Sequence, residues 1–205
     1  MVIVEMLRQL LDSFALWTNS WERETAIKSK REDTLWTLVY EMHRFNYLLW
    51  NEEDKVRRTD LNDSTIVEIK RWVDQLNQER NDAIEGIDEW LLEHHYSHLL
   101  NLDLPIRTET PGSAFDRLSV LSLKIYHMGK QTERTDVGEE HIDACRRKLN
   151  ILVSQWEGLK GALLGLISEL NGGTGRMKVY RQFKMYNDPN LNPQLYRAKN
   201  LKEKR

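Results

Sequence analysis

Polar side chains occupy one face of a predicted helix that spans residues 34–57. With a turn of about 100° per residue, they share a stripe about 100° wide, whose members are His43, Asn46, Trp50, Glu53, Asp54 and Arg57. The opposite face carries Arg44, Glu52 and Lys55, the residue types expected to meet solvent. The stripe is therefore expected to point inward, where imidazole, carboxylate and guanidinium groups could bind an anion or transfer protons.

The next predicted helix, from about Thr65 to Tyr96, repeats this pattern. Arg80 falls within its apolar stripe, which includes Ile84 and Leu91. The polar residues beside that stripe are Asn77, Asn81, Asp88 and His95. Burying such a group without a partner costs about 1 to 3 kcal/mol, so these groups must meet one another, water or a ligand. The pattern fits either a closed structural network of arginines and carboxylates or a ligand site.

A ligand site between the second, third and fourth helices would give these residues distinct roles. The candidate general acids or bases are His43, Glu53 and Asp88. The candidate ligand-binding residues, with arginines as anion clamps and asparagines as orienting groups, are Asn46, Asp54, Arg57, Asn77, Arg80, Asn81, His127 and Lys184. His127 shares a helical face with Asp116, and Lys184 belongs to a basic, aromatic C-terminal segment suited to phosphate groups. The expected ligand is a small anion.

Other chemistries have weaker signals in the sequence. Glu85 and Asp88 could serve a metal-dependent hydrolase, but the chain contains no Glu-x-x-His and no Glu-x-x-Glu motif. His94 and His98 lie near the end of a predicted helix, where imidazolium complements the helix dipole, so we assign no metal ligands. No phosphate-binding loop or nucleophile-elbow motif occurs, and Cys145 falls on a core position of its helix.

Apolar periodicity predicts that an all-α fold positions these residues. Spacings of three and four residues indicate helices near residues 3–21, 34–57, 65–96, 113–129 and 142–170. No alternating run is strong enough for a sheet. We therefore predict a single bundle of about five helices over residues 1–170. An irregular basic and aromatic arm over residues 171–205 then packs on the bundle or extends from it.

Two capping patterns and a glycine pattern add local expectations. Thr65 with Glu68, and Ser113 with Asp116, have the spacing of a capping box, which gives Asp116 a structural role before any catalytic one. The last predicted helix should pack along its whole length. The glycines expected to permit close approach of another helix there are Gly158, Gly161 and Gly165.

Composition limits the functional classes. The chain of 205 residues has a formal net charge of −2 with 30% charged residues, so it lacks the basic character of a nucleic-acid-binding protein. A single cysteine excludes an internal disulfide framework and fits a reducing compartment. Glu5, Arg8 and Asp12 interrupt the N-terminal apolar segment, which is therefore neither a signal peptide nor a membrane span. We expect a soluble, cytoplasmic protein without membrane insertion.

Four long segments resemble a known family. In chain order they are HRFNYLLWNEEDKVRR, LNQERNDAIEGIDEWL, ETPGSAFDRLSVLSLKIYHM and KVYRQFKMYNDPNLNPQLY. They are similar to the bacterial proteins grouped as domain of unknown function family 4254, over about Leu35 to Tyr196. The resemblance implies a cytoplasmic bacterial protein without an established activity, from a group sometimes encountered near glycosyltransferase and lipopolysaccharide genes. The matching positions include most candidate site residues together with Glu85, Asp116, Arg117, Lys124, Tyr186, Asn187 and Asp188.

These observations lead to alternative functional hypotheses. The first is a site for a phosphorylated ligand or a sugar nucleotide, linked through the resemblance to surface-glycan metabolism. The second is a non-enzymatic helical adaptor, whose polar network is structural and whose arm or aromatic surface contacts a glycosyltransferase. The third is a metal-dependent hydrolase that uses Glu85 and Asp88. The sequence leaves the cofactor open, and equally whether the protein is an enzyme.

Overall fold

The computed structural model describes residues 2–23, 34–183, 185, 188–195 and 197. Long helices make up most of this part of the chain: α1 (Val2–Glu22), α2 (Thr34–Val56), α3 (Asp63–Leu91), α4 (Pro111–Thr132) and α5 (Glu139–Asn171). A π-helical turn, Leu92–Tyr96, and a 3-10 turn, Ser97–Leu99, extend α3. The described residues form no strand, only an isolated bridge between Ile106 and Arg176. The predicted all-α class is confirmed.

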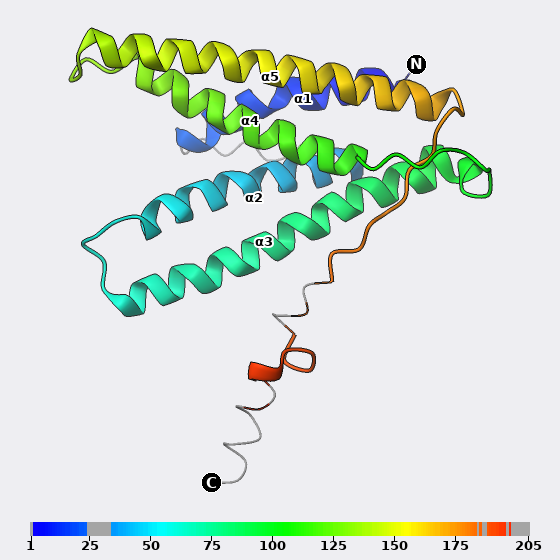
Figure 1. Ribbon diagram of the computed structural model, residues 1–205, viewed down its shortest axis with the longest axis horizontal. Coiled ribbons are helices and arrows are strands. Elements are labelled where there is room, and N and C mark those ends of the chain that lie inside the picture. The colour runs from blue at the N-terminus through cyan, green and yellow to red at the C-terminus, as the bar shows by residue number, and fades with distance from the viewer. Residues whose placement is uncertain (1, 24–33, 184, 186–187, 196, 198–205) are drawn as a thin grey trace.

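Two antiparallel helical hairpins make up the front of the molecule, and α1 lies behind them (Figure 1). α2 pairs with α3, and α4 pairs with α5, in the most extensive contacts between helices. α4 lies between α5 and α2, so it contacts both hairpins. The hairpins meet at the N-terminus of α4 and diverge toward the turns at their far ends (Figure 1). The C-terminal half of α4 is therefore less covered than its N-terminal half.

The main core joins all five helices around α1. Leu7, Leu10 and Phe14 repeat at helical spacing on α1 and are at most 1% exposed. They belong to the same buried cluster as Met42 of α2 and Phe115 of α4. Each such side chain contributes about 1.5 to 3 kcal/mol when fully buried, which explains why the apolar stripe of α1 faces inward. A smaller cluster closes the α2–α3 hairpin and consists of Leu49, Val73 and Leu76.

The helix caps differ from the two predicted capping boxes. α3 begins at Asp63, and the side chain of Asn62 accepts a hydrogen bond from the Thr65 N–H at 2.9 Å. α4 begins at Pro111, where Thr110 is the N-cap and forms a reciprocal capping box with Ser113. Both predicted boxes were therefore wrong by about one turn. The difference at α4 matters most, because Asp116 takes no part in this cap and its carboxylate can bind other residues.

α5 packs along the whole of its predicted apolar seam, as expected, but the middle of this seam is only partly buried. Its buried residues lie toward its two ends: Ile142, Cys145, Leu163, Ile167 and Leu170. Between them, the seam residues Trp156 and Leu159 are partly buried and pack against the main core. Ile151 and Val153 lie off the seam and are 58% and 42% exposed. A Cβ atom added at Gly158, Gly161 or Gly165 would meet nothing within 4 Å, so the predicted close helix approach is wrong. The bundle therefore covers the middle of the α5 seam less completely than its two ends.

The segment after α5 crosses back over the connection that precedes α4 and then passes α3 (Figure 1). Gly173 ends α5 with a φ of 64°, the left-handed conformation that the glycine-rich sequence predicts there. Arg176 then exchanges backbone hydrogen bonds of 3.0 Å with Pro105 and Arg107. Further along, the Arg181 guanidinium donates to Glu85 at 3.2 Å. Within the described residues, no helix has the length and apolar character needed to cross a membrane.

Candidate functional site

The predicted polar residues separate into an open cleft and buried networks. The three-helix cleft, about 310 Å³ in volume, lies between α2, α3 and α4 and is lined by Asn46, Leu49, Trp50, Glu53, Asp54, Arg57, Asn77, Arg80, Val120 and Leu123. Most of the predicted ligand-binding residues are thus brought together. His43, Asn81 and Asp88 do not line this cleft. His127 lines a neighbouring cleft, and Lys184 lies outside the described residues.

Solvent reaches one end of the three-helix cleft, where α2 approaches its C-terminus. The Arg57 guanidinium lies 3.8 Å from a Glu53 carboxylate oxygen and 3.7 Å from an Asp54 carboxylate oxygen. All of these side chains are about half exposed or more, at 66% for Arg57, 48% for Glu53 and 65% for Asp54. Exposed ion pairs of this kind contribute about 0 to 1 kcal/mol. Arg57 also donates to the Glu53 carbonyl oxygen at 2.5 Å, an exposed contact that water can replace if the side chain turns toward a bound anion.

Arg80 occupies the more enclosed end of the cleft and is only 27% exposed. Its Nε atom lies 3.9 Å from an Asp116 carboxylate oxygen, close enough for charge attraction but beyond hydrogen-bonding distance. This buried Nε atom has no hydrogen-bond partner among the described residues. A buried donor left without an acceptor costs about 1 to 3 kcal/mol. Water or a ligand with an acceptor oxygen would remove this cost.

Asp116 connects this cleft to a fully buried network. Asn46 donates from Nδ2 to Asp116 Oδ1 at 2.8 Å and to Ser119 Oγ at 3.0 Å. Ser119 Oγ in turn lies 2.7 Å from His43 Nδ1. His43 Nε2 lies 3.1 Å from the Phe14 carbonyl oxygen, which can only accept a hydrogen bond. His43 therefore carries its proton on Nε2, and its Nδ1 accepts from the Ser119 hydroxyl.

His43 is enclosed by this network. The residue is 0% exposed, and its imidazole stacks on the Phe14 ring with centroids 4.5 Å apart. Burial lowers the pKa of His43 from 6.5 to about 3, although the hydrogen bond with Phe14 raises it. The side chain is thus neutral near pH 7. For His43, the closed structural network was the better of the two interpretations.

The contact between Ser119 and His43 resembles a nucleophile beside its general base. Such a pair needs space for a substrate at the serine hydroxyl. Both residues are 0% exposed, and neither lines a described cleft. The pair is therefore structural. Ser119 also accepts a hydrogen bond from Asn46, and Asn46 donates to the Asp116 carboxylate that lies near Arg80.

Asp88 lies at the N-terminus of α4 and has a different role. Its Oδ1 atom accepts a hydrogen bond of 2.7 Å from the Gly112 N–H, in the first turn of α4. Burial raises the pKa of Asp88 to about 7, while hydrogen bonds from Thr110 and Gly112 lower it. Asp88 also lies about 12 Å along the α3 axis from Arg80, because eight residues separate them at about 1.5 Å each. Asp88 therefore lies outside the cleft that Glu53 and Arg80 line.

The carboxylates considered for a metal-dependent hydrolase have other partners. Glu85 accepts hydrogen bonds from the Arg181 side chain at 3.2 Å and from the Gln182 N–H at 2.6 Å. Asp88 is engaged by Gly112. In the part of the chain that the structure describes, no group of three or more His, Cys, Asp or Glu side chains is placed to hold a metal ion. Nothing in this arrangement favours the hydrolase hypothesis.

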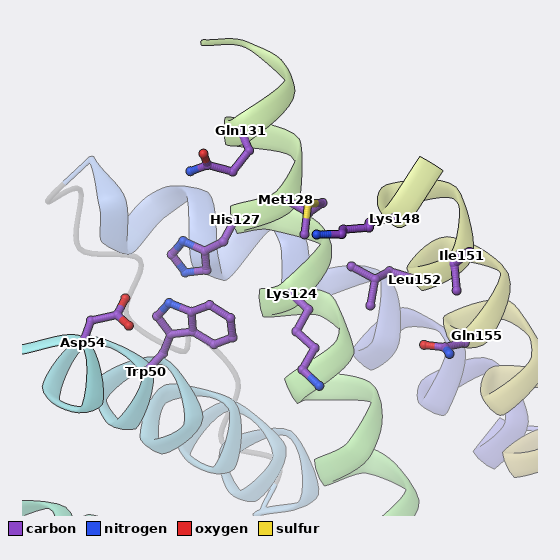
Figure 2. A pocket seen from close by; sticks show the side chains of 10 residues that line it. All are labelled: Trp50, Asp54, Lys124, His127, Met128, Gln131, Lys148, Ile151, Leu152 and Gln155. Atoms are coloured by element: carbon purple, nitrogen blue, oxygen red, sulfur yellow. The ribbon is translucent and has the colours of Figure 1, made fainter. Parts of the chain in front are cut away.

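A second and larger cleft opens beside α4. This α4–α5 cleft, about 570 Å³ in volume, is lined by Trp50, Asp54, Lys124, His127, Met128, Gln131, Lys148, Ile151, Leu152 and Gln155 (Figure 2). It shares Trp50 and Asp54 with the three-helix cleft. The His127 ring stacks on Trp50 with centroids 4.5 Å apart and planes 3° from parallel. Burial lowers the pKa of His127, while the nearby Glu22 and Asp54 carboxylates raise it.

Sequence reasoning did not assign several residues that the tertiary structure makes important. Asp116 was set aside as a cap, and Ser119 was not considered, although both are polar residues within the third family motif. Their spacing of three residues on one helix was the available signal. Lys124 and Lys148 line the α4–α5 cleft from different helices. No local pattern relates these lysines, because the contact between α4 and α5 brings them together.

The helical architecture defines the class of this chain as an all-α bundle protein, and a polar, solvent-accessible cleft lies between three of its helices. A family model described as "Protein of unknown function (DUF4254)" matches residues 36–179. The chain belongs to this family. The match covers the first three resembling segments, whereas most of the fourth lies beyond its end. Searches of curated proteins and of solved structures returned no match.

Proposed function

We propose that the three-helix cleft binds a small phosphorylated ligand of the sugar phosphate or sugar nucleotide class. The observation that carries this proposal is the unpaired Nε atom of Arg80, which is buried at the enclosed end of the cleft. A guanidinium group offers several donors in a fork that matches phosphate oxygens. Arg57 supplies a second cation at the open end, where it contacts the exposed Glu53 and Asp54 carboxylates and donates to the Glu53 carbonyl oxygen.

The remaining lining residues suit the sugar part of such a ligand. Glu53 and Asp54 present carboxylate oxygens that accept hydrogen bonds from sugar hydroxyl groups. Trp50 contributes an aromatic surface for a sugar ring or a base. Asn46 and Asn77 both line the cleft. The Asn77 Nδ2 atom donates to the Val73 carbonyl oxygen at 2.9 Å, so the Asn77 side-chain oxygen can contact a ligand.

The lining of the three-helix cleft also limits which predicted residue could act as a general acid or base on a bound ligand. Of the three predicted catalytic residues, only Glu53 lines it. His43 and Asp88 support the fold around the site instead. The proposal is therefore a binding function, with Glu53 as the group to test if the ligand proves to be a substrate. A link to surface-glycan metabolism is part of this proposal, since it would supply ligands of this class.

A thermal-shift screen of hexose phosphates and nucleoside diphosphate sugars tests this proposal. A ligand at 100 times its Kd stabilises the folded state by about 2.7 kcal/mol, and each kcal/mol raises Tm by about 2 to 4 °C in a protein of this size. At least one compound should therefore raise Tm by several degrees, whereas the unphosphorylated sugar should not. A screen in which no phosphorylated compound shifts Tm would contradict the proposal.

The second candidate function is a helical adaptor, and the C-terminal arm supports it. Phe183 is 82% exposed, Met185 is 56% exposed and Tyr180 is 48% exposed. Apolar side chains gathered on one extended segment are typical of a protein-binding surface. A glycosyltransferase is the partner proposed from the family resemblance. Affinity capture with Phe183→Ser/Met185→Ser as the matched control should lose any stoichiometric partner, and recovery of the same partner by both forms would contradict a role for the arm.

A further inference from the structure

The α4–α5 cleft has an apolar wall that could hold a ligand of its own. One wall is apolar and consists mainly of Met128 on α4 with Ile151 and Leu152 on α5 (Figure 2). Ile151 is 58% exposed there. The volume of about 570 Å³ lies within the range of small-molecule sites. Apolar surface in such a cleft favours a ligand that brings apolar groups of its own.

Cationic groups enter the same cleft from both helices. Lys124 of α4 and Lys148 of α5 line it, and neither has an ion-pair partner within the described residues. Other lysines on these helices are paired: Lys130 lies 3.2 Å from Glu133, and Lys160 lies 3.3 Å from Asp12. Lys124 and Lys148 can therefore pair with the charge of an anionic ligand in the cleft.

Polar groups mark the opposite side of the cleft. Asp54 and the stacked pair of Trp50 and His127 lie on the α2 side, away from Lys148 (Figure 2). The Nε2 atom of His127 is buried and has no hydrogen-bond partner among the described residues. It therefore offers one further polar contact to a molecule in the cleft. The Asp54 carboxylate disfavours an anionic group at this side, which directs the ligand's charge toward the lysines.

We propose that the α4–α5 cleft binds an amphipathic anion, in which an apolar chain or ring carries a carboxylate or a phosphate monoester. The apolar part lies against Met128, Ile151 and Leu152, and the anionic group lies between Lys124 and Lys148. This site is independent of the sugar phosphate proposed for the three-helix cleft. The two sites meet only at Trp50 and Asp54.

Isothermal titration calorimetry of the full chain with octanoate, octyl phosphate and 1-octanol, each below its critical micelle concentration, tests this inference. One or both anions should bind with a stoichiometry of one, at least tenfold more tightly than 1-octanol. Tighter binding of octyl phosphate identifies a phosphate monoester as the natural headgroup, and tighter binding of octanoate identifies a carboxylate. Equal affinity for 1-octanol and both anions, or no binding at all, overturns the proposal.

Matched variants locate the site. Lys124→Met/Lys148→Met keeps the apolar stems and removes both charges, so anion affinity should fall at least tenfold while 1-octanol binding stays unchanged. Lys130→Met is the control, because this lysine pairs with Glu133 and does not line the cleft. Arg80→Met should leave octanoate binding unchanged, which separates this inference from the function proposed for the other cleft. Unchanged anion binding by the double lysine variant would place the ligand elsewhere and refute the assignment.

Discussion

The imidazole of His43 and the hydroxyl of Ser119 lie 2.7 Å apart, and both residues are 0% exposed. This contact joins α2 to α4 through a chain that continues to Asn46, Asp116 and Arg80. In this series of contacts, the buried residues His43, Ser119 and Asn46 all have hydrogen-bond partners. The Arg80 Nε atom at the end of the series has none among the described residues. A closed network therefore supports the open site, and the two interpretations of the polar stripe apply to different parts of it.

His43→Ala should destabilise the protein by about 2 to 4 kcal/mol. The substitution removes a buried ring and deprives the Ser119 hydroxyl proton of its acceptor. It also removes one hydrogen bond to the Phe14 carbonyl oxygen, which still accepts from Thr18 Oγ1 at 3.0 Å. Urea denaturation followed by circular dichroism measures the change in the free energy of unfolding. His94→Ala is the control, because His94 is exposed and should change stability by less than about 1 kcal/mol. A loss below 1 kcal/mol for the His43 variant would be incompatible with this structural role.

The pH dependence of stability should contain opposite contributions from His43 and Asp88. The pKa of His43 falls from 6.5 to about 3 on folding, so its contribution is present above pH 6.5 and is lost as pH falls toward 3. The pKa of Asp88 rises from 3.8 to about 7, so its contribution is present below pH 3.8 and is lost as pH rises through 7. Each slope reaches at most about 1.4 kcal/mol per pH unit.

Variants separate these contributions in urea melts between about pH 4 and 6.5. Relative to wild type, the stability of Asp88→Asn should rise more steeply with pH. This variant lacks the opposing contribution of Asp88 and keeps that of His43. The stability of His43→Gln should rise less steeply or fall, because the Asp88 contribution remains. Parallel curves for wild type and both variants would mean that neither group titrates differently in the folded and unfolded states.

Gly112→Ala should destabilise the protein by about 2 to 4 kcal/mol, whereas Gly158→Ala should stabilise it by about 0.5 to 1 kcal/mol. A Cβ atom at Gly112 would overlap the Ile84 carbonyl oxygen and approach Asp88 Oδ1 to 3.0 Å. At Gly158 the added atom meets nothing within 4 Å, and alanine is the better helix former. Thermal unfolding of both variants gives the comparison. Similar effects of the two substitutions would argue against the close approach of α3 to the first turn of α4.

Arg80→Met should weaken binding of a phosphorylated ligand at least tenfold and should not destabilise the free protein by more than about 1 kcal/mol. The small stability effect follows from the 3.9 Å separation from Asp116 and the partial exposure of both side chains, 27% and 19%. Calorimetry with the compound that gives the largest thermal shift measures the affinity. Arg44→Met is the matched control, since Arg44 pairs with Glu41 at 3.3 Å and lies outside the cleft. Equal losses in both variants would point to a general effect of charge.

The sequence by itself determined the helices and much of the cleft lining. Apolar spacing is a local property, so the stripe of α1 and the bounds of α2 could be read directly from the chain. The stripe that begins at His43 also placed Asn46, Trp50 and Arg57 on one face, and the cleft contains all three of these last residues. Burial along the stripe was overestimated, because α2 extends beyond the core and its last turn reaches solvent.

Only the tertiary structure decided which polar groups meet. His43 finds Ser119 and Phe14, while Asp88 finds the first turn of α4, and these partners are distant in the chain. The two hairpins diverge toward their far turns (Figure 1). Clefts lie between α2, α3 and α4 and beside α4 and α5, and the middle of the α5 seam is only partly buried. Local periodicity predicts which face of a helix is apolar, but the angle at which helices pack determines whether that face is buried, paired or open to a ligand.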